Sequence, residues 1–180
     1  MDQTVSSRNV FSLPTTIIGN TRKSTGDISV LTSKGILYVS PNTISDRNDL
    51  LQKYKTIITY AMSGGNKPGS DGKYQVLSSL QVLEPNEACS ETYLVLDSFS
   101  SKEESYNLMT YASTKFFRFL LLQALTSIHI TKDKFCFIPL QDFTQSWSDE
   151  KLNQKYNLNL DEIDLINSLI RDFSLNGGEE

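Results

Sequence analysis

The stretch SSKEESYNLMTYASTKFFRFLLLQALT, residues 100–126, decides the fold because it carries the longest helical pattern in the chain. Ser101 and, three residues later, Glu104 match the capping box that begins many helices. Apolar side chains then recur at helical spacing, which predicts one face that packs inward. The members of this apolar stripe are Met109, Ala112, Phe116, Phe119 and Leu120. We therefore expect one long helix, against which the rest of the chain can pack.

The residues before this helix are typical of β-structure. Their runs are rich in β-branched and aromatic side chains and are separated by turn-forming residues. A hairpin is expected over 29–40, turning at Lys34-Gly35, and one short helix is expected over 45–54. Further strands are expected over 55–62, 74–85 and 89–99, with a turn at Glu84-Pro85-Asn86 between the last two.

The residues after the helix predict shorter elements. An extended segment is expected over 134–143, a helix from Ser148 to about Tyr156, and a last helix capped by Asn159. Strands thus come first and helices later, which indicates the α+β class. We expect a mixed or antiparallel sheet from the first half, packed with helices from the second half.

The length of 180 residues favours a single domain, which we place at 28–175. An irregular segment at 1–27 precedes it, and a frayed tail at 176–180 follows. The net charge is −4, but residues 1–73 carry nine Lys and Arg against five Asp and Glu. This asymmetry permits a basic face, and solvated surface charge explains it equally well.

The cysteine content and hydropathy favour a cytoplasmic location. Cys89 and Cys136 are the only cysteines, so a disulfide framework is not implied, and both are expected to be small buried side chains. No apolar run approaches the length of a membrane helix, and we expect no membrane partner.

The sequence lacks the residues that several kinds of catalysis need. His129 is the only histidine, and its place between Ile128 and Ile130 favours a structural role. With one histidine, two distant cysteines and no clustered carboxylates, no metal site is expected. The sequence does not predict a serine hydrolase, because no G-x-S-x-G turn accompanies His129.

The segment YAMSGGNKPGSDGKY, Tyr60–Tyr74, is the richest in glycine and suggests a phosphate-binding loop. Gly64 and Gly69 have the spacing of the two P-loop glycines. A P-loop then requires Lys and Ser or Thr, whereas Ser70 and Asp71 follow here. A carboxylate at that place repels phosphate, so nucleotide binding is excluded.

Asp71-Gly72-Lys73 also has the acid-x-Lys spacing of many metal-dependent nucleases. Asp46 or Asp49 could supply the second acid for a magnesium ion, and Lys73 could orient water. The alternative is a turn followed by an exposed lysine, which the Asp-Gly pair favours.

Three blocks of the second half, read in order, carry a resemblance to a known family. They are EPNEACSETYLVL, TKFFRFLLL and FIPLQDFTQSWSDEKLNQKYNLNLDEIDLINSLI. The set closely resembles the C-terminal region of Eco57I-type adenine-N6 DNA methyltransferases of bacterial restriction-modification systems. The opening SSRNVFSLPT is similar to the segment that follows the catalytic domain in that family, with Ser12 in place of a usual glycine.

The resemblance implies a target-recognition domain that binds double-stranded DNA. In the family, a separate methyltransferase domain binds S-adenosylmethionine and holds the flipped adenine with an Asn-Pro-Pro-Tyr-type motif. No two of the five prolines here are adjacent, so that motif is absent from this chain. The resemblance therefore implies a part without catalytic activity or cofactor of its own, whose partners are duplex DNA and a methyltransferase domain.

The resemblance also places the glycine loop against DNA. Ser63, Gly64 and Gly65 would bring backbone amides to a phosphate, and Asn66 would read a base edge or bond its own loop. The cations expected to contact the DNA backbone are Lys67, Lys73, Lys115 and Arg118. Lys115 and Arg118 share one helix face and are expected to be exposed, so pairing with acidic side chains in solvent is the alternative.

Two other functions remain open at this point. One is the magnesium-dependent nuclease built on Asp71 and Lys73. The other is a protein-docking module of a restriction-modification complex.

Overall fold

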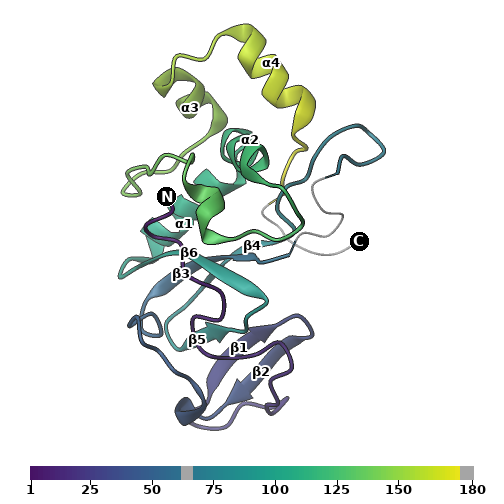
Figure 1. The fold of residues 1–180 in the computed structure, drawn as a ribbon. Helices are drawn as coiled ribbons and strands as arrows, with labels where there is room; N and C mark the ends of the chain where they lie inside the picture. Colours follow the sequence, from purple (N-terminus) through teal and green to yellow (C-terminus); the bar gives the residue numbers. More distant parts are fainter. Residues whose placement is uncertain (62–66, 175–180) are drawn as a thin grey trace.

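The computed structural model describes residues 1–61 and 67–174 of the chain. Two three-stranded sheets form one end of the molecule, and the four α-helices of the described residues form the other (Figure 1). The first helix packs on the second sheet, where it contacts all three strands. The α+β class, with strands from the first half and helices from the second, is confirmed.

The first sheet has the strand order β2-β1-β5. Its strands are β1 (Ile28–Thr32), β2 (Gly35–Val39) and β5 (Glu87–Cys89). β1 and β2 pair antiparallel with Thr32 opposite Gly35, so the predicted hairpin is confirmed. Gly35 has a φ of +112°, which glycine adopts without steric cost. β5 pairs parallel with β1 after a long connection.

The second sheet has the order β4-β3-β6 and is antiparallel throughout. Its strands are β3 (Tyr54–Thr59), β4 (Leu80–Leu83) and β6 (Tyr93–Phe99). The strand expected over 89–99 is therefore wrong as a single element, because the chain passes from one sheet to the other at residues 90–92. The outer edge of β6 is covered by the N-terminal segment, where Ser6 N donates to Val95 O at 2.8 Å.

The helix expected over 45–54 does not form. The Asp46 carboxylate instead accepts hydrogen bonds from the amides of Leu50 and Leu51, at 2.9 and 2.7 Å. Asp49 has a positive φ of 52°, which no helix tolerates. A short acidic side chain has thus taken the amides that a helix would pair with carbonyls.

Lys55 holds this turn against the second sheet from within the protein. Its side chain is fully buried, and Nζ donates to four carbonyl oxygens at 2.6–3.4 Å, those of Leu50, Leu51, Lys53 and Glu84. Burial lowers the pKa of Lys55 to about 8, so the ammonium form still predominates at neutral pH. The ammonium group therefore joins the 50–53 turn and the end of β4 to the start of β3.

The long helical pattern folds as two helices, α1 (Lys102–Ser113) and α2 (Lys115–Ala124). Thr114 between them has a ψ of 152°, and its hydroxyl donates to Tyr111 O and accepts from Phe117 N. One threonine therefore ends the first helix and caps the second, so the expectation of a single helix is wrong. The predicted start is confirmed, since the Ser101 hydroxyl accepts from Glu104 N.

The last two helices are confirmed, whereas the extended segment before them is not. α3 (Asp149–Lys155) is capped by Ser148, and α4 (Leu160–Leu169) begins with a full capping box of Asn159 and Glu162. Two 3₁₀ turns, η1 (Pro41–Thr43) and η2 (Lys132–Phe135), complete the regular elements of the described chain. Residues 136–147 are irregular, because side chains satisfy their backbone: Tyr111 Oη donates to Pro139 O at 2.8 Å. No helix among the described residues is long and apolar enough to cross a bilayer.

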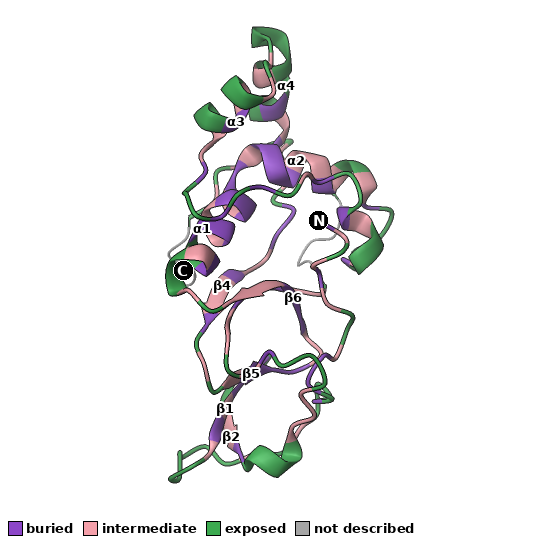
Figure 2. Ribbon diagram, turned by 90° about the vertical axis from the view of Figure 1, so that its left-hand side faces the viewer, coloured by how far each residue is buried: buried purple, intermediate pink, exposed green. Residues whose placement is uncertain are grey.

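Buried side chains form two clusters, one between the sheets and one between the second sheet and the helices. Figure 2 shows burial concentrated on α1, α2 and the strands, while α3 and α4 are largely exposed. Phe116 is buried as expected, but Met109 and Leu120 are only half-buried. Cys89 is buried and Cys136 is exposed, so the expectation for the cysteines is right only for the first.

Replacing Lys55 with methionine should lower the free energy of unfolding by about 2–5 kcal/mol, because the hydrogen bonds from the buried ammonium group to four carbonyls are lost. Denaturant unfolding measures the change. Lys34→Met, at the exposed hairpin turn, is the matched control and should stay within about 0.5 kcal/mol of the parent. Equal effects of the two substitutions would contradict the role given to the Lys55 ammonium group.

Candidate functional site

The glycine-rich segment is expected to contact DNA, and the structure describes its two ends. Ser63, Gly64, Gly65 and Asn66 lie outside the described residues. On the near side the chain leaves β3 through Tyr60 and Ala61, and Ala61 forms an isolated antiparallel bridge with His129. On the far side it returns through Lys67 and the turn that follows.

The returning arm, residues 67–75, is fastened to the segment after α4. Tyr74 and Ile170 form a parallel bridge in which Tyr74 N donates to Leu169 O and Arg171 N donates to Tyr74 O. The guanidinium of Arg171 donates two hydrogen bonds of 2.8 Å to the Asp71 carboxylate. These bonds are the main cause that lowers the pKa of Asp71 to about 2. We call residues 170–173 the C-terminal strap.

The two lysines of this arm differ in the hydrogen bonds that their ammonium groups make. Lys73 Nζ donates to Asn167 O at 3.0 Å, so it is part of the fastening. Lys67 is exposed and makes no hydrogen bond or ion pair with the described residues. Of these two cations, Lys67 is therefore the one that is free to meet a phosphate.

Two of the acids proposed for a nuclease already bind other groups of the protein. Asp71 is bound by Arg171, whereas Asp46 accepts from Leu50 and Leu51 in the turn before β3. Among residues 1–61 and 67–174, no cluster of three His, Cys, Asp or Glu side chains could hold a metal ion. The acid-x-Lys spacing therefore corresponds to a turn whose aspartate forms an ion pair.

A stack of three side chains lies at the near end of the glycine-rich segment. The Arg8 guanidinium lies over the Tyr60 ring, 4.5 Å from its centre. The ring of His129 stacks on Tyr60 at 5.0 Å with an angle of 26° between the planes. Arg8 and His129 are exposed, and Arg8 also pairs with Glu91 at 3.4 Å. The planar groups are therefore held at the surface in a fixed orientation.

Arg118 does not lie on the surface, which corrects the expectation that its side chain is exposed. Its residue is 1% exposed, and it donates to four carbonyls, those of Ser113, Thr114, Gln75 and Arg171. Phe173 lies over the guanidinium at 5.3 Å. Burial lowers the pKa of Arg118 to about 10, which leaves it charged at neutral pH.

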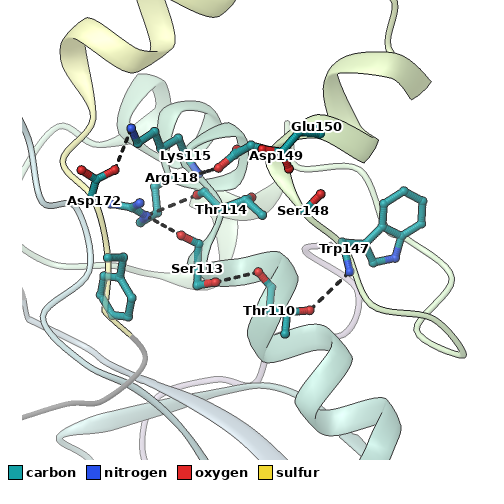
Figure 3. Close-up of a pocket in the computed structure, with 11 residues that line it drawn as sticks. Thr110, Ser113, Thr114, Lys115, Arg118, Trp147, Ser148, Asp149, Glu150 and Asp172 are labelled. Carbon is teal, nitrogen blue, oxygen red and sulfur yellow. Dashed lines mark hydrogen bonds and ion pairs between the residues drawn. The ribbon is translucent and has the colours of Figure 1, made fainter.

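Lys115 is not free either, although its head group remains near the surface. Its Nζ forms an ion pair of 2.8 Å with Asp172 of the C-terminal strap. The side chain of Lys115 is 19% exposed and that of Asp172 is 93% exposed. Figure 3 shows this pair at the rim of a hollow that α2, the start of α3 and the strap surround.

This hollow has a volume of about 300 Å³ and is lined mainly by polar side chains. At one side Asp149 accepts from the amides of Lys115 and Phe116, at 3.0 and 2.9 Å. These amides open α2, so a carboxylate already occupies the positive end of that helix. Trp147 also lines the hollow, and its ring packs under the ammonium group of Lys155.

Sequence reasoning did not anticipate the Arg8–Tyr60–His129 stack or the bond from Arg171 to Asp71. These residues are far apart along the chain, and no spacing connects them. One local signal existed for Arg118: a lone charge inside the apolar run FFRFLLL is a candidate for a buried cation that bonds carbonyls.

Comparison of the chain with protein-family models, with curated proteins and with solved structures finds no match.

Replacing Arg118 with lysine should lower the free energy of unfolding by about 2–4 kcal/mol, because one ammonium group cannot reach carbonyls on opposite sides of the guanidinium. Thermal or denaturant unfolding measures the loss. Arg47→Lys, at an exposed position, is the control for the same exchange and should change stability little. A stable Arg118→Lys protein would mean that the fork geometry is unnecessary.

Proposed function

We propose that this chain is a duplex DNA-binding domain that serves target recognition for an adenine-N6 methyltransferase. The resemblance of its sequence blocks to the C-terminal region of such enzymes motivates the proposal. The observation that supports it best is the Arg8–Tyr60–His129 stack before residues 62–66, together with Lys67 after them, which is exposed and forms no ion pair with the described residues. In this reading the chain carries no catalytic activity of its own.

The chemistry of the stack suits a DNA surface. Arginine donates in a planar fork to phosphate or to a guanine edge, and tyrosine and histidine donate single hydrogen bonds to the backbone. Because Arg8 lies on the Tyr60 ring, less side-chain freedom is lost when it binds. Lys67 would add a phosphate contact without first breaking an ion pair with the described residues.

The corrected positions of the other cations narrow the proposed contact surface. Arg118 is buried, and Lys73 and Lys115 are bonded to Asn167 and Asp172. Among the described residues, the proposed surface therefore consists of the stack and Lys67. S-adenosylmethionine and the reacting adenine would be held by a partner methyltransferase domain.

Lys67→Ala should weaken binding to all duplexes about equally and lower the slope of log affinity against log salt by about 1, because one phosphate contact is lost. Fluorescence anisotropy with labelled duplexes, from low to physiological salt, measures both. Lys151→Ala is the control, since this exposed lysine lies on α3 and bonds Ser146 O. Absence of any salt-dependent duplex binding by the parent chain would refute the proposed function.

Tyr60→Leu should weaken duplex binding by about threefold to tenfold, because the ring that orients Arg8 is gone. Tyr106→Leu serves as its control, since Tyr106 is an exposed tyrosine on α1 that also lies near a cation, Lys102. Unfolding curves confirm that both variants remain folded. Equal affinities of the two variants would remove the stack from the contact surface.

A further inference from the structure

The hollow between α2, α3 and the C-terminal strap has a feature that the proposed contact surface does not use. It contains two cations, Lys115 and Arg118, and a carboxylate that binds one of them from the solvent side. We propose that the hollow is a binding site for a phosphate group, and that Asp172 occupies it when no phosphate is bound. The proposal rests on the proposed function only where the phosphate is taken to be that of DNA.

The first argument is the unequal burial of the ion pair. The side chain of Lys115 is 19% exposed, whereas that of Asp172 is 93% exposed. An exposed carboxylate loses little when it leaves such a pair, because water replaces the lysine at once. Lys115 would then need another anion. Inorganic phosphate or a phosphate monoester carries more charge than a carboxylate and at least three acceptor oxygens, whereas a DNA phosphodiester offers one charge and two free oxygens.

The second argument is the unused donor of Arg118. Its Nε and Nη1 make all four of its hydrogen bonds with the described residues, and Nη2 makes none. Arg118 is 1% exposed and lines the hollow, so this donor has access to an anion there and to little else. A phosphate that replaces Asp172 can therefore meet a second cationic group behind Lys115.

The other carboxylates of the hollow do not occupy the same position. Asp149 is committed to the amides of Lys115 and Phe116, and Glu150 is bonded to Ser148. The Asp149 contact also demonstrates that an oxyanion is stable at this end of α2. Asp172 is thus the carboxylate that must move, and it belongs to a strap rather than to a helix.

Intrinsic fluorescence tests the site, because Trp147 lines the hollow and is the only tryptophan in the chain. The parent chain and its variants are titrated with inorganic phosphate at constant ionic strength. Asp172→Asn should bind phosphate about two- to fivefold more tightly, since the competing exposed carboxylate is removed. Lys115→Ala should abolish the saturable signal. Asp133→Asn, which removes an exposed carboxylate that pairs with Lys134, is the control and should leave the affinity unchanged.

A second arm uses duplex DNA and separates the two sources of phosphate. If the phosphate belongs to DNA, Asp172→Asn tightens duplex binding by the same factor, and Lys115→Ala lowers the salt slope by about 1. If only inorganic phosphate responds, the site stands and its ligand is a small phosphate-bearing molecule. No saturable phosphate signal in either the parent or Asp172→Asn overturns the site, even where duplex binding through Lys67 and Tyr60 persists.

Discussion

The guanidinium of Arg118 joins the parts of the helical half that the chain does not connect directly. Its four hydrogen bonds reach the end of α1, the residue between α1 and α2, the returning arm at residues 67–75, and the C-terminal strap. A buried charge is costly unless hydrogen bonds compensate it, so the junction of α1 and α2, the returning arm and the strap are constrained to meet around it.

Lys55 imposes a similar constraint at the other end of the molecule. Its ammonium group gathers carbonyls from the turn before β3 and from the end of β4. Around Arg118 and around Lys55, backbone carbonyls bond a buried cation, and the neighbouring chain is irregular. Arg118, which the sequence offered for a contact with DNA, and Lys55 therefore both stabilise the fold.

This use of cations decides what remains for binding. The candidate contact surface consists of groups that the fold leaves exposed, namely the Arg8–Tyr60–His129 stack and Lys67, at the two ends of the glycine-rich segment. The arm that carries Lys67 is fastened by Arg171 and Asp71 to the strap, and the strap also carries Asp172. The strap thus supports both the proposed phosphate site and the proposed DNA surface, so a change at the strap should alter both.

The sequence by itself determined the elements that local interactions create. The hairpin turning at Lys34-Gly35, the N-caps Ser101, Ser148 and Asn159, and the order of strands before helices all depend on residues a few positions apart. Only the tertiary structure decided the outcome where a side chain could bond more than one set of groups. Arg118 turns inward because Gln75 and Arg171, which lie far away along the chain, supply carbonyls to its guanidinium. Thr114, which divides the long helix, and Asp46, which takes the amides of a predicted helix, use local partners, and the helical pattern did not show that these bonds would form. A spacing rule that places Lys115 and Arg118 on one helix face cannot see the strap that covers it, and that strap is supplied by residues more than fifty positions away.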